Sequence, residues 1–320
     1  MPNATLIYNP AAGRFPAGPL LTRATRILGE SGWKVRLINM ETGEDLSLAA
    51  KDAIARRDDV VFIAGGDGSV GRVASALAGT STALAVLPSG TANVWAQELG
   101  MQHLDWAHWF ALEDAAHQLS EGSYRYADIG ECNGESFLLW AGLGLDAEVV
   151  NSIEPRERWE KAFATAHYAT LAVWNSLGWD GTDLHVRAPD VEIEGRFMIA
   201  IASNIRAYAG GLLELAPEAR IDDGMLDFWL FAGTSVRDVI QHFVQIWRGT
   251  HVDAPGIVHF QASEATFEVD EALHMQFDGE PRRIHSPLKF SVRKRALRVL
   301  VPAQVEPKLF SSEGNGLRND

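Results

Sequence analysis

Residues 60–69 read Val-Val-Phe-Ile-Ala-Gly-Gly-Asp-Gly-Ser, an apolar run that leads into three glycines placed around one aspartate. The run is typical of a buried parallel strand, and the apolar spacing of the residues that follow it predicts a helix over 69–78. Glycines let the backbone approach a ligand closely, and the N-terminus of a helix attracts anions. We therefore expect a strand, a glycine turn and a helix that together can hold a phosphate group.

Asp67 distinguishes this turn from an ordinary connection between a strand and a helix. A tight turn without a ligand is the alternative, and it would explain a Gly-Gly pair alone better, because glycine is common in turns of every kind. An acid beside a phosphate is useful only where a cation lies between the two groups or where the acid handles a proton. The turn also lacks the Gly-Lys-Ser/Thr ending of a P-loop and the Gly-x-Gly-x-x-Gly pattern. We therefore expect a functional turn of another kind.

The composition is that of a globular protein with room for two domains. The chain has 320 residues, of which 47% are hydrophobic and 22% are charged. The formal net charge of −14 argues against nucleic acid as a partner. Cys132 is the only cysteine, which excludes an internal disulfide and fits a reducing, cytoplasmic compartment. We expect Cys132 to be a small buried apolar side chain.

Membrane insertion is not expected. The first residues, Met1-Pro2-Asn3-Ala4, lack the basic and apolar regions of a signal peptide. No stretch approaches the roughly 20 apolar residues that span a bilayer. A lipid substrate would therefore require transient contact with a membrane surface, so we expect a cytoplasmic protein that can be peripheral at the inner face. The sequence leaves the oligomeric state open, with a homodimer as one alternative.

Strands alternate with helices over the first part of the chain, which predicts an open parallel α/β sheet. Ligands bind such sheets beyond the carboxyl ends of the strands, so the glycine turns at Gly13, 65–68 and Gly90 are expected at one edge. The predicted strands are 5–8, 35–38, 60–64 and 83–87, and the predicted helices are 20–28, 46–57, 69–78, 94–99 and 106–119.

After Gly122 the pattern becomes rich in strands, which predicts an antiparallel β domain. The amphipathic segment 157–177 fits either a helix on the core or a flap over an acyl chain, with Arg156, Arg158 and Lys161 facing headgroups. The other predicted helix is 236–246, and the predicted strands are 126–132, 136–141, 184–187, 196–202, 226–231, 257–262, 265–269, 274–277 and 289–301.

The Gly65–Ser69 turn resembles the Gly-Gly-Asp-Gly-Thr signature of the diacylglycerol kinase-like superfamily. That superfamily includes soluble bacterial lipid kinases, sphingosine and ceramide kinases and, more distantly, NAD kinases and phosphofructokinases. Further segments resemble its motifs in order: Asn9-Pro10-x-x-Gly13, Pro88-x-Gly90-Thr91-x-Asn93, Gly142-Leu143-Gly144-Leu145-Asp146-Ala147, Asn204 with Gly210-Gly211, Ala216-Pro217 through Leu226-Asp227, and Asp278-Gly279-Glu280.

The resemblance implies a two-domain kinase that uses ATP and Mg²⁺. An open parallel α/β domain, similar to that of NAD kinases and diacylglycerol kinases, would cover 1–125 with 296–320 returning to it. An antiparallel β-sandwich would cover 126–295 and take the lipid acceptor. The residues implied in nucleotide binding are Asn9, Gly13, Asn39, Gly65, Gly66, Asp67, Gly68, Ser69, Val70, Gly71, Arg72, Gly90 and Thr91.

The resemblance also implies metal sites. Asp67 and Asp128 would belong to a network of acids and waters around the catalytic Mg²⁺, an ion that prefers oxygen ligands and keeps several waters. A separate structural Mg²⁺ would lie at Asp223 with the carbonyl groups of Arg220 and Met225.

The Asp278-Gly279-Glu280 turn implies the catalytic base for the lipid hydroxyl. A hydroxyl nucleophile benefits from a carboxylate within hydrogen-bond reach. Both Asp278 and Glu280 are candidates, and Asp278 is favoured because Asp-Gly pairs occur at hairpin tips. Such a pair is also explained by a hairpin turn alone.

The expected activity is transfer of the ATP γ-phosphoryl group to a lipid hydroxyl, diacylglycerol-like or sphingoid-like. Three departures from the family pattern leave alternatives open. Ser69 replaces a threonine, Gly71-Arg72 replaces Asn-Glu, and Val94 stands where many relatives have an acid that Glu98 or Asp128 would have to replace. The alternatives are an NAD kinase-like enzyme with a soluble substrate and a non-catalytic lipid-binding relative.

Overall fold

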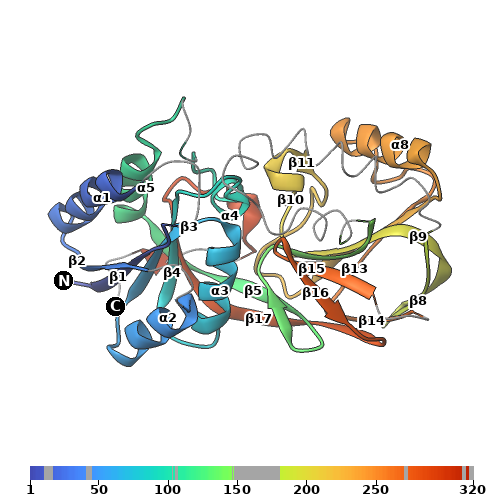
Figure 1. Ribbon diagram of the computed structural model, residues 1–320, viewed down its shortest axis with the longest axis horizontal. Helices are drawn as coiled ribbons and strands as arrows, with labels where there is room; N and C mark the ends of the chain where they lie inside the picture. The colour runs from blue at the N-terminus through green and yellow to red at the C-terminus, as the bar shows by residue number, and fades with distance from the viewer. Residues whose placement is uncertain are drawn as a thin grey trace. The chain divides into compact units, whose positions relative to one another are not determined.

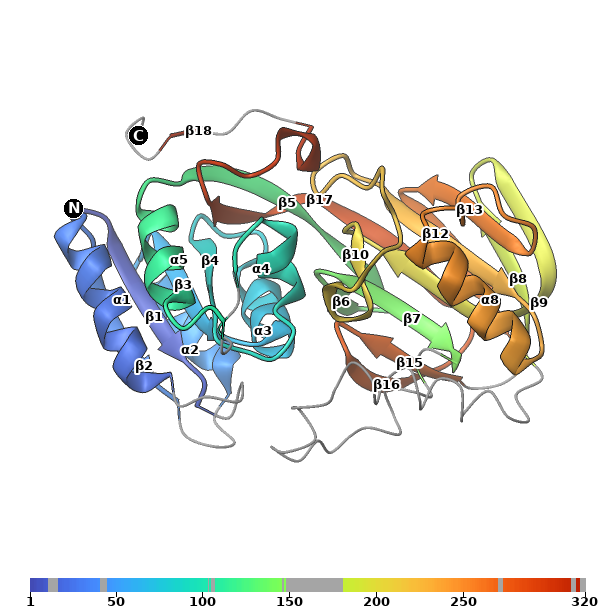
Figure 2. The same ribbon diagram turned by 90° about the horizontal axis from the view of Figure 1, so that it is seen from above.

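The computed structural model describes residues 1–10, 17–40, 45–102, 104, 107–145, 147, 181–269, 273–311 and 315–316. The chain forms two compact units (Figures 1 and 2). Unit 1 comprises Met1–Ile129, Ile221–Asp223 and Lys294–Asp320, and unit 2 comprises Gly130–Arg220 and Gly224–Arg293.

Two of the four unit boundaries fall inside long strands, β5 (Ser123–Cys132) and β17 (Leu288–Val301). The sequence placed residues 221–223 with the second domain, whereas the structure assigns them to unit 1. Backbone hydrogen bonds explain the assignment. The Ile221 N–H donates to the Leu309 carbonyl at 2.9 Å, and the Ile221 carbonyl accepts from the Asp128 N–H at 2.7 Å.

Unit 1 is built on a parallel sheet in the order β2–β1–β3–β4. β17 extends it beside β4, with Val299 opposite Leu84 in parallel register. Every residue of β3 and β4 is buried, as expected for strands covered on both faces. The strands are β1 (Asn3–Tyr8), β2 (Lys34–Asn39), β3 (Val60–Gly65) and β4 (Ala83–Pro88), and β18 (Asn315–Gly316) pairs with β5.

Helices cover both faces of this sheet, with α1 beside α5 and α2 beside α3 (Figure 1). The predicted helix 106–119 is wrong at its start, since α5 begins at Ala111. The N–H groups of Glu113 and Asp114 donate to the Phe110 carbonyl, and these acids in the first turn favour a helix start there. The helices are α1 (Gly18–Glu30), α2 (Leu46–Ala55), α3 (Asp67–Leu77), α4 (Val94–Glu98), α5 (Ala111–Ser120) and the 3₁₀ turn η3 (Pro307–Leu309).

Unit 2 is an antiparallel β structure in which β9 pairs with β7, β8 and β12. The predicted fold class, an open parallel α/β domain followed by an antiparallel β domain, is therefore confirmed. The elements are β6 (Glu135–Phe137), β7 (Trp140–Gly144), β8 (Thr182–Ala188), β9 (Val191–Ser203), β10 (Ala207–Tyr208), η2 (Ala209–Gly211), β11 (Leu213–Glu214), β12 (Leu226–Ala232), α8 (Val236–Trp247), β13 (Ile257–Ala262), β14 (Glu264–Glu268), β15 (Leu273–Phe277) and β16 (Glu280–Ile284).

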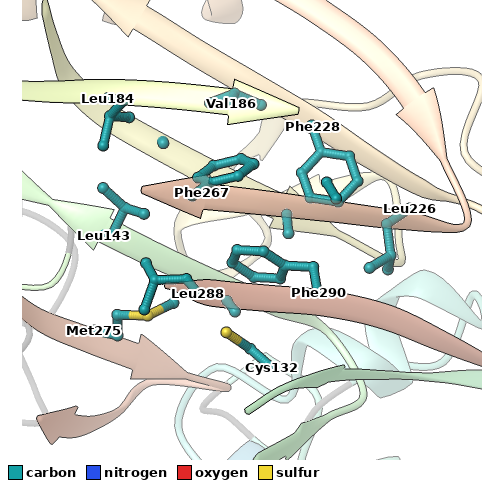
Figure 3. Packing of buried hydrophobic residues seen from close by; sticks show 14 of the residues in the cluster. Cys132, Leu143, Leu184, Val186, Leu226, Phe228, Phe267, Met275, Leu288 and Phe290 are labelled. Carbon is teal, nitrogen blue, oxygen red and sulfur yellow. The ribbon is translucent and has the colours of Figure 1, made fainter. Parts of the chain in front are cut away.

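Unit 2 contains a large buried apolar cluster to which most of its strands contribute (Figure 3). The Phe228 ring contacts the rings of Phe260, Phe267 and Phe290 at centroid distances of 4.9, 5.7 and 5.6 Å. Cys132 is fully buried in the same cluster, as predicted. Burial raises the pKa of its thiol to about 12, so this cysteine is a packing residue.

The segment 136–141 is not one strand, because β6 ends at Phe137 and β7 begins at Trp140. The amphipathic segment 157–177 lies outside the described residues. Among the described helices, none is long and apolar enough to cross a bilayer.

Candidate functional site

Two of the three glycine turns lie against each other at the carboxyl edge of the unit 1 sheet. Gly65 at the end of β3 is opposite Pro88 at the end of β4. The Gly90 N–H donates to the Gly65 carbonyl at 3.1 Å. A Cβ on Gly90 would lie only 2.3 Å from the Gly66 Cα. Position 90 therefore accepts glycine alone, and the two turns present one continuous backbone surface.

The third turn begins at Asn9, which is joined to the first. The Asn9 N–H donates to the Ala64 carbonyl at 3.0 Å, and the Asn9 Nδ2 donates to the Ser69 Oγ at 2.9 Å. Ser69 is buried. Its hydroxyl group therefore holds the Asn9 side chain in place. Asn39 is exposed at the end of β2 opposite Tyr8. Gly13 lies outside the described residues.

Asn93 closes the Gly90 turn. It has a left-handed backbone (φ 53°), its Oδ1 accepts from the Gly90 N–H at 2.9 Å, and its Nδ2 donates to the Gly90 carbonyl at 2.9 Å. Thr91 is half-buried in this turn. Beside it the Ser89 hydroxyl is buried without a hydrogen-bond partner in the described part of the chain. The turn thus keeps an unsatisfied polar group, which is unusual in a folded interior.

Asp67 lies at the N-termini of two helices. It is in the first turn of α3, and its Oδ1 accepts from the Trp95 N–H of α4 at 3.2 Å. Burial raises the pKa of the Asp67 carboxyl above its ordinary value, and the backbone N–H groups of Val94 and Trp95 oppose that shift. The side chain of Asn93 does not cap α4, so Asp67 takes that role. The helix ends, as well as any cation, therefore stabilise its charge.

The remaining candidates for nucleotide binding lie on α3, and two residues discussed with them lie on α4. Gly66 is the N-cap of α3, and Arg72 is exposed in the second turn of this helix. Val94 and Glu98 are buried on α4. Gly68, Val70 and Gly71 occupy the first turns of α3.

Asp128 is one of two buried acids of unit 1 that contact Arg295. Its carboxylate is fully buried and accepts from the Arg295 N–H at 2.5 Å. The sequence did not single out Asp222, which is also fully buried. Asp222 accepts from the Ser311 hydroxyl at 2.7 Å and lies 3.5 Å from the Arg295 guanidinium. Nothing in the pattern of Asp222-Asp223 distinguishes the two acids before the chain is folded.

The other metal candidates are more dispersed. Asp223 is half-buried, and its carbonyl accepts from the Lys294 Nζ at 3.0 Å. Arg220 and Met225 belong to unit 2. Within the described ranges, no three His, Cys, Asp or Glu side chains gather in a way that could hold a metal. Mg²⁺ is commonly held by one or two carboxylates together with waters and substrate phosphates.

The Asp278-Gly279 pair forms the tip of the β15–β16 hairpin in unit 2. Both residues have a positive φ, 50° for Asp278 and 83° for Gly279, as a tight two-residue hairpin requires. The hairpin expected from the sequence is thereby confirmed. The Asp278 N–H donates to the Trp140 carbonyl at 3.0 Å, which ties the tip to β7.

The Asp278 carboxylate is occupied by backbone donors. It accepts from the N–H groups of Leu138 (2.8 Å), Leu139 (2.8 Å) and Trp140 (3.2 Å). These three residues turn toward one carboxylate, which explains why the predicted strand 136–141 is broken between β6 and β7. Asn204 supports the same loop, because its Nδ2 donates to the Leu138 carbonyl at 2.9 Å.

Glu280 has different surroundings. It is the first residue of β16, its side chain is 26% exposed, and the Arg282 Nη2 lies 3.1 Å from its Oε2. Next to it the Gly279 N–H donates to the buried Gln276 Oε1 at 2.8 Å, which fixes the turn. The two carboxylates of the motif are thus distinct: Asp278 holds the backbone, and Glu280 reaches solvent.

Known proteins resemble both units. Residues 3–132 match the diacylglycerol kinase catalytic domain, and residues 141–301 match the YegS C-terminal NAD kinase beta sandwich-like domain. A diacylglycerol kinase of Bacillus subtilis is 26% identical over 88% of this chain and 90% of its own length. A probable lipid kinase YegS-like protein of Pseudomonas aeruginosa is 32% identical over 81% of this chain and 82% of its own.

Solved structures share the fold. A putative diacylglycerol kinase from Bacillus anthracis superposes with a TM-score of 0.77 at 20% identity, over 95% of this chain and 98% of that one. The glycine turns, the Asp278 hairpin and these matches agree along both units. The chain belongs to the diacylglycerol kinase-like family of lipid kinases.

Proposed function

We propose that this protein transfers the γ-phosphoryl group of ATP to the hydroxyl group of a lipid in a reaction that depends on Mg²⁺. One observation carries the proposal: the Gly66 and Gly90 backbones approach so closely that a single Cβ would fill the space between them. A backbone surface without side chains, beside the N-terminus of α3, is a suitable cradle for phosphates.

The residues of unit 1 fit the phosphate groups of ATP. Asn9, Ser69 and Thr91 add hydroxyl and amide groups around the glycine turns. Asp67 and Asp128 would belong to the hydrated network of the catalytic Mg²⁺, which when bound neutralises phosphate charge. Asp223 with the carbonyls of Arg220 and Met225 remains the proposed structural site. Phosphoryl transfer needs positioning and charge neutralisation more than covalent chemistry.

In unit 2 we assign the general base to Glu280 and a positioning role to Asp278. A carboxylate has about four lone-pair sites, and Asp278 already accepts three backbone hydrogen bonds. The Glu280 side chain is 26% exposed, and the Arg282 Nη2 lies 3.1 Å from its Oε2. It can therefore accept the proton of an incoming hydroxyl, while Asp278 holds the hairpin tip in place.

The acceptor is proposed to be diacylglycerol-like, with a sphingoid lipid as the second choice. The relatives named above are a diacylglycerol kinase and a probable lipid kinase, which favours a lipid over the soluble acceptor of an NAD kinase. Discrimination between related acyl chains amounts to only about 1–3 kcal/mol per methylene.

Phosphate transfer from γ-³²P-ATP to an extracted lipid mixture tests the function. The purified protein should label a lipid in the presence of Mg²⁺ and lose labelling with EDTA. Clear binding of Mg-ATP without label in any lipid would leave the non-catalytic lipid-binding alternative, and formation of NADP would support the NAD kinase alternative. Lipid analysis of cells with and without overexpression identifies the product.

Asp67→Asn should lower turnover by at least about 10²-fold, because it removes a negative charge from the proposed network around the catalytic Mg²⁺. It should not weaken the fold, since the Asn Oδ1 can still accept from the Trp95 N–H. Burial raises the folded-state pKa of Asp67, so its ionisation costs stability as the pH rises through that pKa. The variant avoids this loss and should melt at or above the wild-type temperature in EDTA at neutral pH. Near-normal turnover would make Asp67 a structural cap only.

A further inference from the structure

Helix α8 of unit 2, which is labelled in Figure 2, exposes apolar side chains on one face. Ile240, Phe243 and Trp247 are 49%, 45% and 68% exposed. At about 100° per residue, these three side chains lie within about 60° of the helix circumference. A surface helix normally carries polar residues on its solvent side. A contiguous exposed apolar face on such a helix indicates a binding surface.

The body of unit 2 holds α8 by a different side. His242 and Ile246 are the buried residues of the helix, and the His242 Nε2 lies 2.7 Å from the Ala232 carbonyl. The His242 ring also packs edge-on against Phe231 at a centroid distance of 5.4 Å. The exposed apolar residues are therefore not the ones that attach the helix to the fold.

The charges around the exposed face are basic. Asp238 is the only acid of α8, and it is bound within the capping box by the N–H and hydroxyl groups of Ser235. Arg237 and Arg248 are exposed, and both lie on the side of the helix away from His242 and Ile246. In a chain with a net charge of −14, α8 and its C-cap thus carry apolar and basic groups, and the one acid of the helix is held in the capping box.

We propose that α8 docks this protein on the surface of a bilayer that contains anionic lipids. Phe243, Ile240 and Trp247 would enter the boundary between headgroups and acyl chains, where tryptophan is favoured. Arg237 and Arg248 would bind lipid phosphates at the level of the headgroups. The proposal is independent of phosphoryl transfer, since docking requires no reaction.

A second copy of the chain is a less suitable partner for this face. Two α8 helices that met by their exposed faces would bring Arg237 and Arg248 toward the same arginines of the other copy. The one acid of the helix is already used in its capping box, so it could not pair with them. A bilayer with anionic headgroups satisfies both the apolar and the basic groups.

Flotation with vesicles tests the proposal on the full-length protein. Vesicles of phosphatidylcholine with about 30 mol% phosphatidylglycerol should bind the wild-type chain, and pure phosphatidylcholine vesicles should bind it less. The double variant Phe243→Ser with Trp247→Ser should lose at least about tenfold in partition coefficient. Arg237→Gln with Arg248→Gln should remove the preference for the anionic vesicles. Leu48→Ser changes an exposed leucine of α2 (63% exposed) and should bind as wild type.

The changed side chains are exposed, so the variants should remain folded, and their melting temperatures check this. Equal flotation of the wild type and the Phe243/Trp247 double variant would overturn the proposal. It would also be overturned if the wild type did not float and light scattering showed a dimer that the double variant dissociates, since the face would then bind a second copy. Kinase activity on a detergent-dispersed lipid is measured separately, so loss of docking and loss of chemistry are distinguished.

Discussion

Glu280→Gln should lower kcat on the lipid acceptor by about 10²–10⁴-fold, the range expected when a positioned general base is removed. The substitution keeps the shape of the side chain and removes the charge that accepts the hydroxyl proton. Nucleotide affinity should change little, because a general base acts on the hydroxyl group of the acceptor and not on the nucleotide. Steady-state turnover at saturating ATP and a separate nucleotide titration measure the two effects.

Asp278→Asn is the matched comparison. In the wild type, the Asp278 Oδ2 accepts from the Leu138 N–H, and the Asp278 Oδ1 accepts from the N–H groups of Leu139 and Trp140. An asparagine amide would set a donor against one of these donors, which costs about 1–3 kcal/mol. The variant should therefore melt at a lower temperature, while Glu280→Gln should not. If Glu280→Gln stayed within about threefold of wild-type turnover and Asp278→Asn lost about 10²-fold without melting earlier, the two roles would be exchanged.

The order of strands and helices in unit 1 could be predicted because each element carries its own signal. β3 is a continuous apolar run that is buried throughout. The glycine turn follows this run, and α3 begins there. The exception is α5, whose predicted start at 106 is wrong: its apolar spacing extends upstream of Phe110, but the chain turns there before the helix begins.

The contacts of the candidate site depend on residues that are distant in sequence. Asp67 caps α4 through Trp95, and Asp278 orders a loop that lies about 140 residues earlier in the chain. Neither pairing leaves a local pattern. The Asp278-Gly279 hairpin was predictable because its turn residues are neighbours, but the division of roles with Glu280 required the three backbone donors to be located.

The Gly66–Gly90 contact is a further example, because each glycine alone is only a turn signal. The sequence placed both turns at the same edge of the sheet from the strand order. It did not show that the two backbones touch, or that Asn93 hydrogen-bonds across the second turn. Those contacts make Gly90 a restrictive position that a small substitution can test.

Gly90→Ala should lower the free energy of unfolding by about 1–3 kcal/mol or more. It should also weaken nucleotide binding by at least about tenfold. The new Cβ would lie 2.3 Å from the Gly66 Cα and 2.8 Å from both the Gly66 N and the Asn93 Oδ1. Because the obstructing atoms are mostly backbone, the two turns would have to separate, and the Gly90 N–H would lose the Gly65 carbonyl. Melting of the ligand-free protein and titration with an ATP analogue measure the two losses.

Gly29→Ala is the matched control for a glycine-to-alanine change. Gly29 lies in α1, and a Cβ there would meet nothing within 4 Å. Alanine in a helix is favoured over glycine by about 0.5–1 kcal/mol, so this variant should melt at a higher temperature and bind nucleotide as wild type. The opposite changes in melting temperature of the two variants separate the effect of crowding at the cradle from any general effect of a glycine-to-alanine substitution. A Gly90→Ala protein with wild-type melting and full nucleotide affinity would show that the turns can separate without cost, and the proposed phosphate cradle would then be wrong.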